Sequence, residues 1–218
     1  MDKKELERRE YLFDISAEET GREGIRTITG RPIVYNSRTD IGYFDEIIMP
    51  GALDNADLTD VRFLVNHNID MIPLARSRRN NENSTLRLDP NIYGLDMAAD
   101  VDEVNNQTAR ALVSAVDRGD ISGMSFMFSV GADEWEGLDT DHPLRRITEI
   151  ASVVEVSAVT FPAYSDTSIG VRAAEALENA KALLESKRSE ATETLEKVDE
   201  CRNQLDLLKE KTKILSRG

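Results

Sequence analysis

The sequence predicts an α+β fold that is mainly β, with one long helix at its C-terminal end. Between Tyr11 and about Val171, short apolar runs alternate with turn residues. Strands of this length at this spacing favour a compact, largely antiparallel barrel or sandwich. The composition changes after Gly170, because residues 172–217 contain no proline or glycine and are rich in Ala, Leu, Glu and Lys. Such a stretch is typical of a long amphipathic helix.

The same changes in composition divide the chain into three parts. Residues 1–24 form a lead-in whose first ten residues, MDKKELERRE, are charged and are expected to fray. They lack the apolar core of a secretory signal. Residues 25–171 form the β domain, and residues 172–218 form the C-terminal helix. No run approaches eighteen consecutive apolar residues, so we expect no membrane span.

The expected strands of the β domain are short apolar runs that end at turn residues. Three clear examples are residues 27–29 before Gly30, 33–35 before Asn36, and 86–88 before the Asp-Pro-Asn turn at 89–91. Gly, Pro, Asn and Asp at these positions are the residues that turns require. These runs therefore predict consecutive strands joined by tight connections.

Two segments interrupt the strand pattern. Residues 49–58, which open with Met-Pro-Gly-Ala-Leu, predict a short helix or turn. Residues 105–118 predict a regular helix, which an Asp or Asn can cap at its start and Gly119 can end. Apolar residues recur in and beside it near helical spacing: Val104, Ala111, Leu112, Ala115 and Val116.

The C-terminal helix carries two heptad series. The first is Leu177, Leu184, Ala191, Val198, Leu205 and Thr212; the second is Ala180, Lys187, Thr194, Cys201, Leu208 and Leu215. One lysine and two threonines weaken this apolar seam relative to a regular coiled coil. Three roles stay open for the helix: a coiled coil between copies, an arm that binds a scaffold, and a helix packed on its own β domain.

Charge and composition narrow the classes of partner. The net charge of −14 lies entirely on residues 1–171, because residues 172–218 carry equal numbers of acidic and basic residues. An acidic domain repels phosphate backbones, so we expect no nucleic-acid partner.

The single cysteine, Cys201, excludes an internal disulfide framework and suits a reducing cytoplasm. One cysteine and two histidines cannot form a Cys/His zinc cluster. A carboxylate site for Ca²⁺ or Mg²⁺ stays open, although no run resembles an EF-hand loop.

Three segments carry the residue types of a serine hydrolase, and the first, residues 62–68, ends at His67. This histidine follows an apolar strand and lies between two asparagines. Strand alternation places it with Phe63 and Val65 on the core face. A catalytic role therefore requires the end of the strand, or a bulge, to redirect the imidazole. A loop histidine with no special role is the commoner case.

The second segment, residues 121–130, carries Ser125. Alternation puts one set of residues on the core face: Met124, Phe126, Phe128 and Val130. The other set faces outward: Gly123, Ser125, Met127 and Ser129. A serine that alternates with bulky apolar residues is usually only an outward strand residue, so this signal is weak by itself.

The third segment, residues 153–163, places Glu155 between valines. A glutamate there is a poor strand residue and costly to desolvate, so it faces water or has a partner that stabilises its charge. We expect Glu155 to face outward, on the same side as Ser125 if both strands wall one barrel. A carboxylate that orients an imidazole would complete a nucleophile–base–orienter arrangement.

Taken together, these segments resemble the phage prohead protease family. His67 in VNHN, Ser125 in GMSF and Glu155 in EVSAVTFPAY are similar to three motifs of that family, in the family's order. Further matches are EIIMPGA at 46–52, PLAR at 73–76 and YGL at 93–95, and the resemblance covers about residues 25–171. It implies a closed β-barrel like that of the herpesvirus assemblins, with flanking helices. It also implies a serine endopeptidase in which Ser125 is the nucleophile, His67 the base and Glu155 the orienting acid.

The resemblance also implies substrates and a location. They are the scaffold, free or fused to the major capsid protein, and the protease itself by autocleavage. Cleavage would occur inside the procapsid, in the cytoplasm of an infected bacterial cell. No cofactor, metal, nucleic-acid or membrane partner is implied, and the C-terminal helix is a possible site of homo-oligomerisation. The alternatives are a non-catalytic capsid-assembly scaffold and a protease–scaffold fusion.

The chain departs from the family pattern at three places. Met127 stands where the family often has glycine, and Ala75 replaces the glycine of Pro-Leu-Gly. The assemblins carry an arginine pair where this chain has Pro-Ala-Tyr at 162–164. The oxyanion donor therefore stays open between backbone N–H groups near residues 76–79 and the N–H of Ser125.

Rival candidates exist for each catalytic role. His142 lies in a turn-like run and is the other possible base, and Ser122 and Ser129 are weaker nucleophiles than Ser125. Glu149 shares the strand face of Glu155 in a less apolar setting and is the rival orienting acid. Asp70 lies near His67 in the sequence and is a weaker rival.

Overall fold

The computed structural model describes residues 6–12, 15–78, 83–160 and 173–192, together with residues 194, 197 and 202. The chain forms two compact units, Met1–Ala174 and Glu175–Gly218. Each unit is described by itself below. The first contains the β-sheets and every candidate catalytic residue.

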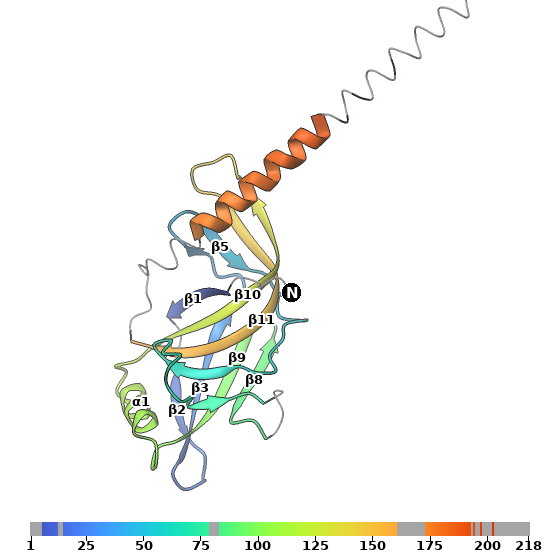
Figure 1. Cartoon of the computed structure of the whole chain (residues 1–218). Helices are drawn as coiled ribbons and strands as arrows, with labels where there is room; N and C mark the ends of the chain where they lie inside the picture. The colour runs from blue at the N-terminus through green and yellow to red at the C-terminus, as the bar shows by residue number, and fades with distance from the viewer. Residues whose placement is uncertain are drawn as a thin grey trace, which may run out of the picture. The chain divides into compact units, whose positions relative to one another are not determined.

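The larger of two sheets carries those candidates. Its seven strands are β1 (Leu6–Leu12), β4 (Thr39–Asp40), β5 (Asp45–Ile48), β6 (Arg62–Val65), β7 (Ala75–Arg76), β10 (Gly123–Glu136) and β11 (Leu144–Val159). The main path runs β1-β10-β11-β5-β4, and β6 joins β11 to β7. Strand β11 pairs with β10 along one side and with both β5 and β6, in parallel, along the other. Figure 1 shows β10 and β11 as long, curved neighbours.

The smaller sheet is wholly antiparallel. It contains β2 (Ser16–Glu19), β3 (Ile25–Val34), β8 (Leu86–Asn91) and β9 (Gly94–Asp102) in the order β2-β3-β9-β8. Gly94 at the β8–β9 turn has a φ of 148°, and a Cβ there would lie 1.9 Å from the carbonyl oxygen of Ile33. Only glycine therefore allows β3 and β9 to approach this closely.

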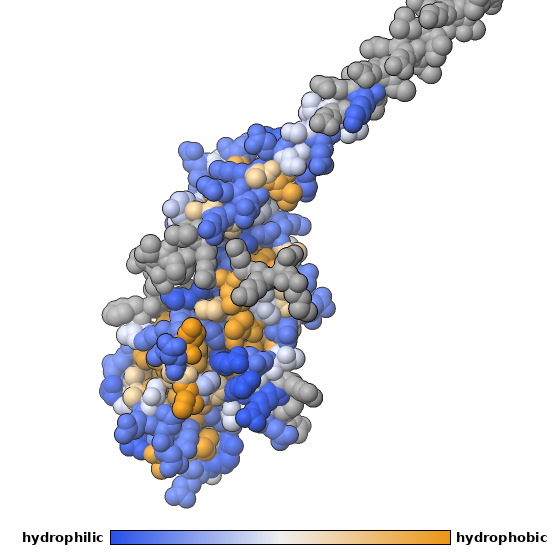
Figure 2. All heavy atoms as spheres, viewed as in Figure 1, coloured by the Kyte–Doolittle hydropathy of each residue, from blue (hydrophilic) through white to orange (hydrophobic). Residues whose placement is uncertain are grey.

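One apolar core joins the two sheets. Strand β10 contributes Phe126 and Phe128, and the smaller sheet contributes Ile28, Leu95 and Met97, all of which are buried. Burying each such side chain stabilises the fold by about 1.5–3 kcal/mol. Hydrophilic residues cover much of the visible face of this unit, with hydrophobic residues gathered near its middle (Figure 2).

The prediction of a mainly β, α+β fold is confirmed. The described strands form two open sheets that share a core, and no closed barrel is found among them. Alternating strands with one buried face occur in both barrels and sandwiches, so the sequence pattern left both open. The barrel came from the family resemblance, and nothing in the described residues establishes its closure.

The segment expected to be a lead-in, residues 1–24, contributes two strands. Strand β2 pairs with β3, and β1 pairs with β10 along its whole length, from Leu6 opposite Ser129 to Leu12 opposite Gly123. Because β1 is rich in charged residues such as Arg9, its sequence does not show the alternation of apolar and polar residues that predicts a strand. Arg9 is held in an ion pair with Glu46, far along the chain, which the local sequence does not reveal.

A buried ion-pair cluster joins β1 to β5 and β11. Arg9 of β1, Glu46 of β5 and Arg145 of β11 are each at most 4% exposed. An Arg9 Nη2 donates to Glu46 Oε2 at 2.7 Å, and Arg145 donates to both carboxylate oxygens of Glu7, at 2.8 and 2.9 Å. Burial alone would raise the pKa of Glu7, but Arg9 and Arg145 outweigh it and lower that pKa. The cluster therefore holds its charges as pairs.

The helix predicted at residues 105–118 is confirmed as α1 (Gln107–Asp117). Asn106 caps its start, because its side-chain oxygen accepts hydrogen bonds from the backbone N–H groups of Thr108 and Ala109, at 3.0 and 3.2 Å. Residues 49–58 form turns rather than a helix, and they bury Ala52, Leu53 and Leu58. The sequence had left helix or turn open there.

The C-terminal segment is helical from residue 173 to 192. This agrees with the predicted helix, and the later heptad positions lie mostly outside the described residues. No helix in the described part of the chain is long and apolar enough to cross a membrane.

The division into two units predicts that a chain ending at Ala174 folds. The first unit keeps its shared core and both sheets when residues 175–218 are removed. We expect soluble protein whose Tm lies within a few degrees of that of the full chain. Circular dichroism and thermal unfolding of the two chains measure this. An insoluble or unfolded truncated chain would show instead that the helix covers an apolar face of the β unit.

Candidate active site

Strand β11 places Glu155 beside Ser125 on one face of the larger sheet. Ser157 of β11 pairs with Ser125 of β10, and Glu155 pairs with Met127. Directly paired residues share a face, as do residues two apart on one strand. Ser125, Ser157 and Glu155 therefore lie on one face, while Phe126 points into the core from the other. This confirms the predicted alternation and the shared side of Ser125 and Glu155.

His67 leaves the strand alternation just after the end of β6. Asn66 and His67 have φ values of 50° and 54°, in the left-handed region that few residues other than glycine adopt. The N–H of Asn66 donates to the carbonyl of Ala158 at 2.9 Å, and the Asn66 side-chain oxygen accepts from the N–H of Thr160 at 2.9 Å. These bonds hold a turn that redirects the imidazole away from the core. The sequence had required such a redirection for a catalytic role.

The imidazole of His67 meets the carboxylate of Glu155. His67 Nδ1 contacts Glu155 Oε1, and the two side chains are only 5% and 2% exposed. A buried carboxylate beside Nδ1 fixes the orientation of the ring and leaves Nε2 to exchange a proton with a nucleophile. The expected outward exposure of Glu155 is wrong: its carboxylate is buried, and the imidazole of His67 is its partner.

Ser125, like Glu155, is buried where the sequence predicted exposure. It lies on the face opposite the core residues of β10, as predicted, but it is 0% exposed rather than outward. Its hydroxyl donates to the backbone carbonyl oxygen of Arg9 in β1, at 2.8 Å. The exposure was mispredicted because strand alternation identifies a face and not what covers it. Proton transfer from Ser125 to His67 requires the hydroxyl to leave this acceptor.

Ser157 is a buried site residue that the sequence did not single out. Its hydroxyl donates to Glu155 Oε2 at 2.6 Å and accepts the backbone N–H of His67 at 3.2 Å. The available signal was its position two residues after Glu155, on the same strand face. Without the pairing of β6 with β11, nothing connected Ser157 to the histidine.

The rival residues lie elsewhere. Glu149 is exposed and six residues before Glu155 on β11, about 20 Å away along an extended strand. Ser129 shares a hydrogen bond with Ser152 at 2.8 Å, and Ser122 and Asp70 are exposed. The carboxylate that contacts His67 Nδ1 is that of Glu155.

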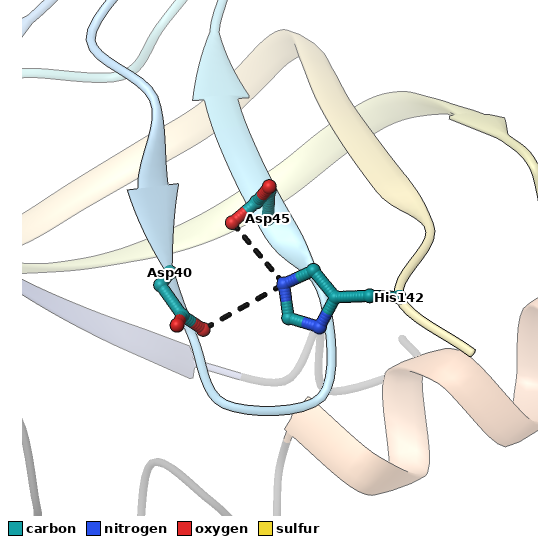
Figure 3. Close-up of side chains that lie close together, drawn as sticks. All are labelled: Asp40, Asp45 and His142. Carbon is teal, nitrogen blue, oxygen red and sulfur yellow. Dashed lines mark hydrogen bonds and ion pairs between the residues drawn. The ribbon is translucent and has the colours of Figure 1, made fainter. Parts of the chain in front are cut away.

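His142 belongs to a separate, exposed cluster. Its Nε2 lies 3.2 Å from Asp45 Oδ1 and 3.7 Å from Asp40 Oδ1 (Figure 3). One ligand atom from each residue lies within 4.8 Å of the others, a spacing that a metal ion could use. Burial alone would raise the pKa of Asp45, but hydrogen bonds from Arg38 and His142 outweigh it and lower that pKa. Arg38 is ion-paired with Asp45, and the His142 ring lies within reach of both carboxylates, so the contacts are explained without a metal ion.

Backbone donors near residues 76–79 are largely committed within the fold. The N–H groups of Arg76 and Arg78 donate to Thr85 Oγ1 and Ser84 Oγ, each at 2.9 Å, and that of Ser77 donates to the carbonyl of Val61 at 2.8 Å. They do not suit an oxyanion hole in this conformation. Residue 79 and the Pro-Ala-Tyr run at 162–164 lie outside the described residues.

A cavity of about 490 Å³ lies beside the PLAR motif. It is lined by Pro73, Leu74, Ala75, Arg76, Arg78, Asn83 and Thr85. Strand β7 contributes two of these residues and pairs with β6, the strand that ends before His67. The two arginines give this cavity a basic lining.

Comparison with known proteins gives one match. A family model described as caudovirus prohead serine protease matches residues 12–182, which include Ser125, His67 and Glu155. No curated protein matches the chain, and neither does any solved structure.

The contact between Glu155 and His67 predicts a loss of serine reactivity in Glu155→Gln. The neutral amide removes the charge that stabilises an imidazolium, so reaction of Ser125 with a fluorophosphonate should slow on the order of a hundredfold to ten-thousandfold. Mass spectrometry of the labelled peptide gives the rate, and thermal unfolding should show no comparable loss of stability. Glu149→Gln, on the same strand but exposed, is the matched control and should react normally. The opposite result would move the orienting role to Glu149.

Proposed function

This chain belongs to the caudovirus prohead serine protease family, and we propose that it cleaves peptide bonds with Ser125, His67 and Glu155 as its catalytic triad. The observation that carries the proposal is the buried contact between His67 Nδ1 and Glu155 Oε1. Glu155 belongs to β11, which is directly paired with β10, the strand of Ser125. A base, an orienting acid and a serine thus share one sheet face inside the matched region.

The proposed reaction is acyl transfer to Ser125. His67 Nε2 takes the hydroxyl proton as Oγ attacks a peptide carbonyl, and then gives a proton to the leaving amine. Glu155 accepts from Nδ1 throughout, which holds the ring and stabilises the imidazolium. Water, deprotonated by the same histidine, then releases the acyl group from the serine. The oxyanion donor stays open, because the N–H groups of residues 76–78 are committed and Ser125 is paired with strands on both sides.

The proposed substrates are capsid assembly proteins. A prohead protease acts on capsid or scaffold proteins in the procapsid of an infected cell, as the family implies. For this chain we propose the scaffold, free or fused to the major capsid protein, and the protease itself. No cofactor or metal takes part in this chemistry.

Two roles are proposed for the parts of the chain. Residues 25–171 form the protease domain, together with the strands of residues 1–24, and residues 172–218 form a helix that binds another copy, the scaffold or the capsid interior. The long helix also supports a second function, a scaffold fused to a protease, because extended amphipathic helices suit assembly. A scaffold without catalysis would not need a buried His–Glu pair next to a serine.

The proposal predicts that Ser125→Ala abolishes processing. Loss of a triad nucleophile lowers the rate roughly a thousandfold to a millionfold. The change removes one buried hydrogen bond, to the Arg9 carbonyl, so the free energy of unfolding should fall by only about 0.5–1.5 kcal/mol. Co-expression with the capsid protein of the same phage, read by mass, measures processing. Ser129→Ala, which changes a buried serine of the same strand, is the control and should process normally. Normal processing by Ser125→Ala would refute the assignment.

A further inference from the structure

Ser157 lies between the two residues that would activate the nucleophile. Its side chain is fully buried, and its position on β11 is paired with Ser125 on one side and with Leu64 of β6 on the other. Its single hydroxyl makes two bonds: it donates to Glu155 Oε2 at 2.6 Å and accepts the N–H of His67 at 3.2 Å. One oxygen atom therefore contacts both the orienting acid and the backbone of the base.

These two bonds constrain the carboxylate and the turn at once. A carboxylate held only at Oε1 can rotate about its last side-chain bond, which is a broad torsion. With Oε2 held by Ser157, the carboxylate plane is fixed and Oε1 stays directed at Nδ1. The bond to the N–H of His67 also supports a residue in the left-handed region, whose conformation is costly without local support.

We propose that Ser157 is a positioning residue of the catalytic triad, which acts through Glu155 and His67 without contacting substrate. The inference rests on the proposed function for its catalytic consequence. Its structural part, control of the His67–Glu155 geometry, is measurable without any turnover.

The test compares Ser157→Ala with wild type and with Ser129→Ala. Ser129 is a suitable control because it is buried on the neighbouring strand β10 and bonds to Ser152, away from the histidine. The first readout is the NMR signal of the His67 Nδ1 proton, which lies far downfield when it is bonded to a carboxylate. The second is the rate at which Ser125 reacts with a fluorophosphonate. Only two histidines are present, so His142→Gln assigns the signal.

In Ser157→Ala the downfield signal should weaken or broaden, and Ser125 should react about tenfold to a hundredfold more slowly, as displacement of a base by about 1 Å would produce. Both readouts should be unchanged in Ser129→Ala. An unaltered signal and a rate within twofold of wild type would overturn the inference. If neither wild type nor any variant labels at Ser125 and co-expressed capsid protein is not processed, the proposed function fails, and Ser157 is then judged by the NMR signal alone.

A separate observation concerns access to Ser125. Strand β1 occupies the side of β10 that is not paired with β11, with Glu10 opposite Ser125. The Ser125 hydroxyl donates to the Arg9 carbonyl of this strand and is fully buried. A nucleophile in this state has its proton directed at a backbone acceptor and is closed to a peptide.

The ion-pair cluster secures β1 in place. Arg9 is bonded to Glu46 of β5, and Glu7 is bonded to Arg145 of β11, with all four groups largely out of water. Breaking one partner of a buried pair leaves a charge that is costly to keep there, so the strand is held cooperatively. We infer that β1 is an autoinhibitory strap, which must leave the edge of β10 before substrate reaches Ser125.

A reversible disulfide tests the strap in the full chain. Leu6 and Ser129 are paired across β1 and β10. Paired residues of antiparallel strands have Cα atoms about 4.5–5.5 Å apart, which suits a disulfide. The variant is Leu6→Cys with Ser129→Cys, in a Cys201→Ser background that removes the native thiol. Bond formation is verified by mass before fluorophosphonate labelling.

The oxidised variant should label Ser125 at least tenfold more slowly than the same protein after reduction. Since both states have one sequence, a folding defect affects both and does not produce the difference. Equal rates in the two states would overturn the strap. No labelling in either state, together with no processing of co-expressed capsid protein by wild type, would contradict the proposed function instead.

Discussion

The pairing of β11 with β10 on one side and with β6 on the other is the constraint on which the site depends. Ser157 belongs to both pairings. In the β10 pairing it lies opposite Ser125, and in the β6 pairing it lies opposite Leu64, three residues before His67. A shift of one residue in either register would turn a side chain to the other face of the sheet. Ser125 and Leu64 therefore both lie beside Ser157 because a single strand is shared.

Burial of charge is the second feature that organises the first unit. The His67–Glu155 contact and the Arg9–Glu46–Arg145 cluster both join strands or strand ends of the larger sheet, and each gives its buried polar groups a partner. Desolvation opposes such arrangements, and good geometry with further hydrogen bonds offsets it. Glu155 illustrates the point, because its two oxygens have separate partners in His67 and Ser157. Removal of any one member is therefore expected to disturb the rest.

A covered Ser125 fits its proposed role as the nucleophile of a protease that must not act too early. The chain belongs to the prohead protease family, and an enzyme enclosed with its substrates, as proposed here, needs a state in which the serine is inactive. A Ser125 hydroxyl bonded to the Arg9 carbonyl would be such a state. The strand that covers Ser125 is held in part by buried ion pairs, of Arg9 with Glu46 and of Glu7 with Arg145. Loss of one partner from such a pair would weaken that hold.

The sequence by itself determined the strand-rich class, helix α1, the helical start of the C-terminal segment and the common face of Ser125 and Glu155. These follow from local periodicity and caps, which depend on neighbours in the chain. Only the tertiary structure decided that Ser125 and Glu155 are buried, that the chain turns at Asn66 and takes His67 out of its strand alternation, and that Ser157 contacts both Glu155 and His67. It also decided that the charged segment around Arg9 is a strand. Each of these depends on a partner from a distant strand, and periodicity along one strand gives the face of a residue but not what that face meets.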